Sequence, residues 1–372
     1  MTHRERFRTV LQGRRPDRTP MVTRLDLWLN AAISDNAVPA EYAGLKEHEI
    51  EARLGMGRSA RFRGFLRHTF PTAQVREERR GGETVKETTL GRRTLRQVST
   101  QSAQNERAGI SPHITEYPLK TAEDYRVMAG LWETLKWETR PEAFEAFSAE
   151  IGENGLPMLI LGPCPAHAVM LHDAGYENIY LHLNDFPDQV ENLIRVMEAR
   201  FEEWWPAVAA TSAELVLHGA HWSGDMTPPP LFKRFFLPYF QRFTAAMRAA
   251  GKRVAFHADA DLRGLLDLVL ESGMDVADCF ASAPLVSVTL AEARQRWGKR
   301  VVIWGGVPST VLDPGCPEAE FRQWLDGFLA DISDGRGFIA GVSDNFMPGS
   351  DIRRLAEVAR AVAAIVPAAS DS

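Results

Sequence analysis

Short apolar runs alternate with longer amphipathic stretches through the second half of the chain. Six such runs follow residue 155, at 157–163, 214–221, 253–259, 274–280, 300–306 and 337–344. A continuous apolar run of this length is typical of a strand buried on both faces, and helical stretches between such strands indicate a parallel sheet. An earlier run at 19–22 brings the number of predicted strands to seven.

One more strand would close this pattern into a (β/α)8 barrel, and the alternative is an open, doubly wound sheet. None of the runs is followed by a GxGxxG or P-loop motif, which disfavours the nucleotide-binding form of an open sheet. We therefore predict an α/β fold, a TIM-like barrel, with its eighth strand in the middle of the chain.

The first third of the chain follows a different pattern. Residues 2–13 predict an N-terminal helix that ends at Gly13. Between about residues 70 and 118, β-forming residues alternate with charged ones, and turns are expected at Gly81-Gly82 and at Gly91. This alternation is typical of an antiparallel meander with one face in water. We expect one barrel domain over residues 1–372, with a β-rich insertion at 71–118.

The composition is that of an ordinary globular protein, with 45% hydrophobic and 25% charged residues in a chain of 372. The net charge of −6 gives no reason to expect a nucleic acid or a membrane as partner. The N-terminus has no apolar core like a signal peptide, and no apolar run approaches the roughly 18 residues that span a membrane. The widely spaced Cys164, Cys279 and Cys316 argue against a disulfide framework and predict a cytoplasmic location.

Most of the apolar runs end in residues that can bind a metal, move a proton or contact a ligand. In a parallel barrel these strand ends meet at the active site. The candidates are Cys164, His218, His221, Asp225, His257, Asp259, Asp278, Cys279, Trp304, Ser343, Asp344 and Asn345. A single polar strand end is explained by a helix cap, whereas several with His, Asp and Cys together favour a site.

The pair His257 and Asp259 is the clearest candidate for a metal site. Side chains at alternate positions of an extended segment point the same way, which suits two ligands of one metal. Cys279 would add a thiolate and Asp344 a carboxylate, and these four residues could form a tetrahedral zinc site. Plainer roles stay open: Asp259 or Asp261 could cap the next helix, and Cys279 could be a small buried hydrophobe.

Other strand-end residues have different predicted roles. His221 and Asp225 are the predicted catalytic residues, which would orient the substrate or carry protons. His218 lies within an apolar run and is expected to be a hydrogen-bonded core histidine. The predicted substrate contacts are Arg24, Trp222, Trp304 and Asn345. The absence of a Gly-x-Ser-x-Gly motif disfavours a serine hydrolase.

Four segments of the chain, in the right order, resemble the uroporphyrinogen decarboxylase-like superfamily. They are RERFRTVLQGRRPDRTPMV (4–22), the stretch from SGDMTPPP to ESGMD (223–275), WGKRVVIWGGVPSTVL (297–312) and GFIAGVSDNFMPGSDIRRLAEVARAV (337–362). The resemblance implies a (β/α)8 barrel with N-terminal helices, to which residues 71–118 are an addition.

The superfamily divides by chemistry. Its decarboxylases carry an arginine-rich N-terminal motif that grips the carboxylates of the substrate, and here this position reads PMVTRLDLWLN, without paired arginines. Its other branch contains zinc methyltransferases, which pass methyl groups between corrinoid proteins or methylated substrates and a thiol. These bind zinc through a His-x-Cys pair and a later cysteine. Here the pair is His257-x-Asp259, followed by Cys279 and then by Ser343 or Asp344.

The resemblance thus implies a zinc-dependent methyltransferase that acts on a small molecule, with a corrinoid protein as partner, and it allows a homodimer. Two alternatives stay open. One is a metal-independent decarboxylase or lyase that binds a carboxylated small molecule through Arg18 or Arg24. The other is a non-catalytic barrel subunit. Bound metal would distinguish the zinc methyltransferase from both alternatives.

Overall fold

The computed structural model describes residues 1–365. It begins with α1 (His3–Leu11), and the side chain of Thr2 caps this helix by accepting the Glu5 N–H while the Glu5 carboxylate accepts the Thr2 N–H. This reciprocal pair satisfies two backbone donors that a helix start leaves free. The chain leaves the helix before Gly13, whose φ is 70°. The predicted N-terminal helix is therefore confirmed.

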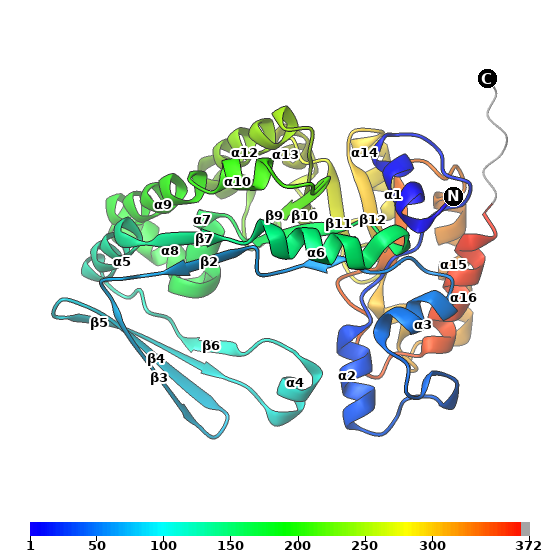
Figure 1. The fold of residues 1–372 in the computed structure, drawn as a ribbon, viewed down its shortest axis with the longest axis horizontal. Helices are drawn as coiled ribbons and strands as arrows, with labels where there is room; N and C mark the ends of the chain where they lie inside the picture. Colours follow the sequence, from blue (N-terminus) through cyan, green and yellow to red (C-terminus); the bar gives the residue numbers. More distant parts are fainter. Residues whose placement is uncertain (366–372) are drawn as a thin grey trace.

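A parallel sheet forms the centre of the molecule (Figure 1). Its order is β1 (Arg61–Phe62), β8 (Met158–Gly162), β9 (Leu215–His218), β10 (Arg253–His257), β11 (Val276–Phe280), β12 (Val302–Val307) and β13 (Phe338–Val342). All six apolar runs of the second half are strands, as predicted.

The apolar run at residues 19–22 occupies the eighth strand position of the barrel. Met21 forms a parallel bridge with Ala340 of β13, and its carbonyl accepts the N–H of Gly57, just ahead of β1, at 2.9 Å. The sheet therefore curls round on itself, as a barrel requires. The strand missing from the sequence pattern is β1, which reads only Arg-Phe and so carries no apolar run; it lies at residues 61–62 and not in the middle of the chain, where the eighth strand was predicted.

The barrel interior is filled by side chains from alternate strand positions. These side chains form one buried cluster: Phe7, Val10, Val22, Leu156, Met158, Leu215, Leu217, Ala255, Val276, Val302, Trp304 and Ile339. Helix α1 supplies two of them and thereby closes the end of the barrel at which the strands begin. The ring of Phe7 packs edge-on against Trp304, with 4.8 Å between ring centroids.

Helices cover the outside of the barrel. They are α2 (Asp26–Ser34), α3 (Glu47–Arg53), α5 (Ala122–Thr134), α6 (Pro141–Ile151), α7 (Pro165–Ala168), α8 (Tyr176–Asp185), α9 (Pro187–Glu202), α10 (Trp205–Ala209), α11 (Pro229–Leu231), α12 (Leu237–Ala249), α13 (Leu266–Glu271), α14 (Leu290–Trp297), α15 (Glu318–Asp331) and α16 (Ile352–Ala363). None of the helices in residues 1–365 has the length and apolar character needed to cross a membrane.

The helix after β10 starts later than predicted. Asp261 does not cap it, because α13 begins only at Leu266. The Asp261 carboxylate instead accepts the N–H groups of Arg263 and Ser287, at 3.0 and 2.9 Å. Gly264, with a φ of 82°, interrupts the helical backbone between Asp261 and the start of α13. The N-cap prediction for Asp261 was therefore wrong, and this carboxylate holds a loop.

Residues 71–118 contain the predicted antiparallel meander. Its strands are β3 (Gln74–Arg80), β4 (Glu83–Leu90), β5 (Arg93–Thr100) and β6 (His113–Glu116), paired in that order, with α4 (Ala103–Ala108) before the last. The turns fall at Gly81 and Gly91, both with φ near 60°. The chain enters and leaves this sheet through the antiparallel pair β2 (Leu66–Thr69) and β7 (Lys136–Thr139).

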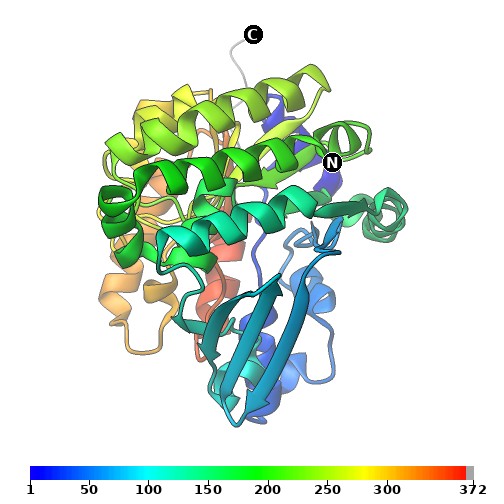
Figure 2. The same ribbon diagram turned by 90° about the vertical axis from the view of Figure 1, so that its left-hand side faces the viewer.

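The inserted sheet lies on the side of the barrel where the strands end, because it follows the end of β1 (Figures 1 and 2). Leu95 of β5 packs with Val127 and Leu131 of α5. Gln97 donates to the carbonyl of His172, in the π-helical segment Val169–Ala174 that follows α7, at 2.8 Å. Arg107, at the end of α4, donates to Ser34 Oγ of α2, also at 2.8 Å. The insertion is thus tied to three segments that surround the mouth of the barrel.

Candidate active site at the barrel mouth

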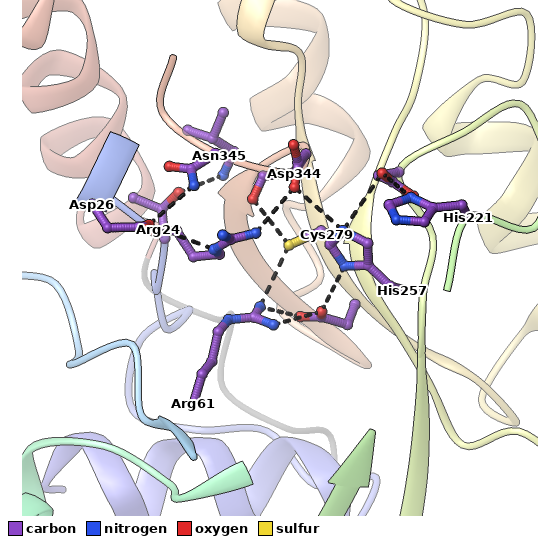
Figure 3. Close-up of polar contacts among 12 residues, drawn as sticks. Arg24, Asp26, Arg61, His221, His257, Cys279, Asp344 and Asn345 are labelled. Atoms are coloured by element: carbon purple, nitrogen blue, oxygen red, sulfur yellow. Dashed lines mark hydrogen bonds and ion pairs between the residues drawn. The ribbon is translucent and has the colours of Figure 1, made fainter. Parts of the chain in front are cut away.

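His257, the last residue of β10, lies among three carboxylates (Figure 3). Its Nδ1 is 3.1 Å from Asp278 Oδ2. Its Nε2 is 3.3 Å from Asp344 Oδ1 and 3.5 Å from Asp259 Oδ2. The imidazole is only 9% exposed, so it meets these groups where water screens charges poorly. Two of the predicted metal ligands, Asp259 and Asp344, thus face one ring nitrogen of a third, His257.

Asp278 holds this histidine in place. Its carboxylate is fully buried and is gripped by Arg61 of β1 through two hydrogen bonds, at 2.8 and 2.5 Å. The two-pronged geometry fixes the orientation of both groups. The guanidinium of Arg61 lies over the Trp304 ring, 4.8 Å from its centroid, which supports it from below. Asp278 Oδ2, which accepts one of these two hydrogen bonds, is thereby held facing His257 Nδ1.

The charges of these groups are strongly coupled. Burial alone would lower the pKa of His257, but the sulfur of Cys279 and the hydrogen bonds to Asp278 and Asp344 raise it well above its usual range. Burial alone would raise the pKa of Asp278, but Arg61 and His257 hold it well below its usual range. The same histidine and Arg24 lower the pKa of Asp344 against the effect of its burial. Asp278 and Asp344 are therefore kept charged, and a positive charge is favoured at His257.

The backbone is strained at this site. Four non-glycine residues among 1–365 have positive φ, and three of them are His221, Cys279 and Asp344, with φ of 51°, 55° and 61°. Cys279 sits in an irregularity of the ladder between β11 and β12, where the register shifts between Asp278 and Phe280. Such a conformation costs about 1–3 kcal/mol per residue and gathers where side chains must be aimed for function. Strain at three strand ends that meet at the mouth favours an active site there.

His221 forms the outer part of the cluster. Its Nδ1 is 2.7 Å from Asp259 Oδ2, and its side chain is half exposed, at 49%. The other oxygen of Asp259, Oδ1, is buried and has no hydrogen-bond partner among the described residues. An unpartnered buried carboxylate oxygen next to two histidines is what a bound cation would satisfy.

Cys279 faces a different side of His257 from Asp259. Its thiol donates to the Asp344 carbonyl at 3.2 Å, and Arg61 Nη2 lies 3.4 Å from the sulfur. Two groups of ligand atoms lie within 4.8 Å of one another among the described residues: His221, His257 and Asp259, and separately His257, Asp278 and Cys279. The four predicted ligands do not form one such group: Asp344 belongs to neither and Cys279 only to the second, so metal ligation by these two residues stays a prediction.

Two predicted substrate contacts lie at the mouth. Arg24 Nη1 is 3.1 Å from Asp344 Oδ1, and its Nε is 3.6 Å from Asp26 Oδ1. Asn345 is fully buried and donates to the same Asp26 at 3.0 Å, while its own Oδ1 has no partner within residues 1–365. Both residues therefore support the wall of the cluster on the side of Asp26 (Figure 3).

The structure does not bring the remaining predicted residues into the cluster. Trp222 is fully buried and stacks on Phe256, with 4.3 Å between ring centroids. Trp304 lies beneath Arg61 and donates its indole N–H to the Val22 carbonyl at 2.9 Å. Asp225 is exposed, and within residues 1–365 its carboxylate has no hydrogen bond or ion pair. The contacts of the two tryptophans favour packing roles.

Sequence reasoning missed Arg61 of β1 and Arg63, which follows that strand. Arg61 is the main partner of Asp278, and Arg63 lies two residues further along. Burial lowers the pKa of Arg63, and the charges of Arg24 and Arg61 lower it further, so Arg63 lies near both. Within the described chain Arg63 has no ion-pair partner. The alternating arginines of RFRGF (61–65) were the available signal, but they are informative only once β1 is known to be a strand.

Comparison with known proteins agrees with this architecture. Residues 103–365 match the family model of uroporphyrinogen decarboxylase (URO-D), which is more than half of the chain. The chain therefore belongs to the URO-D family, and the superfamily resemblance of the sequence is confirmed.

Two curated relatives carry the name uroporphyrinogen decarboxylase. The one from Thioalkalivibrio sulfidiphilus is 27% identical over 177 residues, which is 47% of this chain and 48% of the relative. The one from Cupriavidus necator is 29% identical over 163 residues, covering 42% and 43%. The chain thus spans about half the length of the curated relatives it matches.

A solved structure extends the comparison to almost the whole chain. The methyltransferase from Methanosarcina mazei covers 97% of this chain and 98% of its own, with a TM-score of 0.56 and 13% sequence identity. At this identity the match concerns the fold alone. It agrees with the α/β barrel predicted from the sequence.

Proposed function

We propose that this protein is a metal-dependent enzyme whose cation binds at His257 Nε2, between Asp259 and Asp344. The observation that carries the proposal is the spacing of these atoms, 3.3 and 3.5 Å from the nitrogen to the two carboxylate oxygens. Ligand atoms about 2.0–2.1 Å from a tetrahedral zinc ion lie roughly 3.3 Å from one another. Each of the two carboxylates therefore stands from this nitrogen at about the spacing that a shared zinc ion would require, and His221 completes a group of three with His257 and Asp259.

The surroundings of His257 also fit a metal ligand. Metal-binding histidines usually give their second nitrogen to a carboxylate, which fixes the ring and its tautomer. Asp278, itself fixed by Arg61, occupies that position at Nδ1. His221 offers a further nitrogen beside Asp259, whose second oxygen is the unpartnered one. This set of nitrogen and oxygen donors is harder than a thiolate-rich site, and it accepts zinc as well as other divalent ions.

The reaction that we propose is methyl transfer from a methylated donor, such as a corrinoid, to a thiol. It is supported by membership of the URO-D family and by the barrel shared with a solved methyltransferase. A zinc ion bound here would act as a Lewis acid and lower the pKa of a thiol that reached it.

The residues of the chain would do the rest. His221 is half exposed at the mouth, and its ring can take up the proton that the thiol gives up, while Asp259 holds the ring by its Nδ1. The buried pair of Arg61 and Asp278 keeps His257 oriented. Arg24 holds Asp344 against the same ring.

A decarboxylase or lyase is the second candidate, and Arg63 is the observation that favours it. This arginine has no ion-pair partner in the described chain and lies near Arg24 and Arg61, where it can receive a carboxylate of a substrate. In that reaction His257 and Asp344 would be acid–base groups and would need no metal.

Methylcobalamin and a set of small thiols distinguish the two candidates. The purified protein, loaded with zinc, is mixed with methylcobalamin and each thiol, and the methylcobalamin absorbance is followed. We expect loss of the methyl group that depends on both the thiol and His257, and none with the His257→Ala variant. Absence of transfer with every thiol tested, together with metal-independent release of CO2 from a carboxylated substrate, would contradict the proposal.

A further inference from the structure

A cavity of about 340 Å³ lies at the end of the barrel opposite the mouth. It is bounded by the end of α1, which lies beside α14, and by the segments that lead into β10, β11, β12 and β13 (Figure 1). Arg253, which lines it, begins β10, whereas His257 ends the same strand. Four residue steps of about 3.3 Å separate the two by roughly 13 Å along the strand. This cavity is therefore distinct from the mouth.

Two ion pairs build the walls of this cavity. Arg253 is paired with Asp275 at 2.9 Å, and the same carboxylate accepts the N–H of Val254, also at 2.9 Å. Arg294 is paired with Asp334 at 2.6 Å and reaches the carbonyl of Arg336 at 3.3 Å. These four charged groups balance one another and tie together the segments before the strands. Their role in stabilising the fold is sufficient to explain them.

Three further cations on the same cavity have no such explanation. Lys299, Arg300 and Arg336 line it, yet none of their side chains forms a hydrogen bond or an ion pair within residues 1–365. They leave a surplus of three positive charges at one concave site in a chain whose net charge is −6. Like charges gathered in a concavity repel one another and focus a positive field into it. The arrangement favours an anion as occupant.

We propose that this cavity binds a diphosphate group, either free or carried by a small organic molecule. Guanidinium groups match the oxygens of phosphate in pairs, and two unpaired arginines with a lysine suit two adjacent phosphates. The apolar side chains of Leu11 and Val301 on the same wall leave room for an organic part. Because the cavity and the mouth share no residues, the proposal does not depend on the proposed function.

Calorimetric titration of the whole protein tests the proposal, with inorganic pyrophosphate and with ADP as the two probes. We expect one site per chain, with an affinity that falls as salt is added, because the contact is ionic. The Arg300→Gln/Arg336→Gln variant should bind at least about tenfold more weakly, as expected when two charge-assisted contacts are lost. Tighter binding of ADP would identify a carried diphosphate as the ligand, and equal or tighter binding of pyrophosphate a free one.

A matched control keeps the charge change constant. Arg92 and Lys233 are exposed, lie outside this cavity and have no ion pair within the described chain. The Arg92→Gln/Lys233→Gln variant therefore lowers the net charge by the same two units and should bind like the wild type. Circular dichroism establishes that each variant is folded. Absence of binding at millimolar concentrations of both probes, or equal loss in the two variants, would overturn the proposal.

Discussion

His218 and His257 end neighbouring strands of the same barrel, yet their surroundings are opposite. His218 is fully buried, and its two nitrogens lie 2.9 Å from the Gly162 carbonyl and 2.8 Å from the Tyr239 hydroxyl. Burial among these neutral groups lowers its pKa to about 4. His257 lies among three carboxylates, and its pKa is raised well above the usual range, against the effect of burial.

The difference follows from the direction of each side chain. Leu217 pairs with Ala255 across the ladder, so His218 and His257 fall on opposite faces of the sheet. Leu217 and Ala255 belong to the cluster inside the barrel. His257 shares that inward face at the end of its strand, whereas His218 points to the helices. A histidine at a strand end thus becomes a core residue or a site residue according to one step of register.

The largest expected difference between the two histidines is in activity. His257→Ala should reduce turnover by at least about 100-fold, since loss even of the partner of a metal ligand costs roughly 10- to 100-fold. His218→Ala should leave turnover per folded molecule nearly unchanged and instead lower the free energy of unfolding by about 2–4 kcal/mol, through a cavity and unpaired groups. Steady-state kinetics and urea unfolding of both variants measure this. Equal loss of turnover in both would erase the contrast.

The buried charges at the mouth predict the next largest effect. Arg61→Met leaves the fully buried Asp278 carboxylate without its arginine partner, and should lower the free energy of unfolding by about 3–5 kcal/mol. Arg24→Met removes the partner of Asp344, whose side chain is 42% exposed, and should cost about 1 kcal/mol or less. Chemical denaturation of the two variants checks the ordering, and a larger loss for Arg24→Met would contradict it.

A similar contrast exists between two buried carboxyl groups, Asp278, whose pKa is held low by Arg61 and His257, and Glu51. Glu51 of α3 is 2% exposed and accepts one N–H, from Ser59 at 2.9 Å, and burial raises its pKa to about 8. Because the folded state then keeps a proton that the unfolded state loses near pH 4.5, stability should fall as pH rises from about 4.5 to 8.

The slope due to this one group reaches at most about 1.4 kcal/mol per pH unit. Glu51→Gln, which keeps the shape of the side chain, should remove this contribution, as measured by the unfolding midpoint against pH. Wild type and variant with parallel profiles over this range would show that Glu51 is charged in the fold.

The smallest effect concerns the strained backbone of the mouth. Cys279→Gly places at φ 55° the residue that adopts this conformation freely, and should stabilise the fold by up to about 1 kcal/mol, less the packing lost with the thiol. Cys279→Ala keeps the strain and serves as the control. Thermal unfolding of the two variants gives the difference, and a Gly variant less stable than the Ala variant would show that the backbone is unstrained.

Much of the fold could be predicted from the sequence because the second half follows one simple rule. Six buried strands have continuous apolar runs, and the helices between them are amphipathic, so both periodicities are visible. β1 could not be predicted because it is only two residues long and one of them is the charged Arg61. The strand position at residues 19–22 is little more than the bridge between Met21 and Ala340. Its apolar run was visible because these residues pack into the barrel.

The site could be predicted only in part. His257, Asp259 and Asp344 were found because they end strands that were themselves visible. The partners that give them their properties come from β1 and from a bulge, and the arginines of β1 are a signal only once β1 is known to be a strand. The predicted convergence of Cys279 with Asp259 rested on proximity of strand ends alone, whereas the positive φ at Cys279 re-aims that side chain toward Arg61 and the Asp344 carbonyl.

Metal content is the most direct test of the central claim, that His257 Nε2 and its two facing carboxylates hold a divalent cation. The wild type, His257→Ala and His218→Ala are purified without chelators and measured by mass spectrometry. The account predicts about one equivalent of zinc or another divalent ion per chain in the wild type and in His218→Ala, and its loss in His257→Ala. No metal in the wild type, or metal retained by His257→Ala, would contradict it.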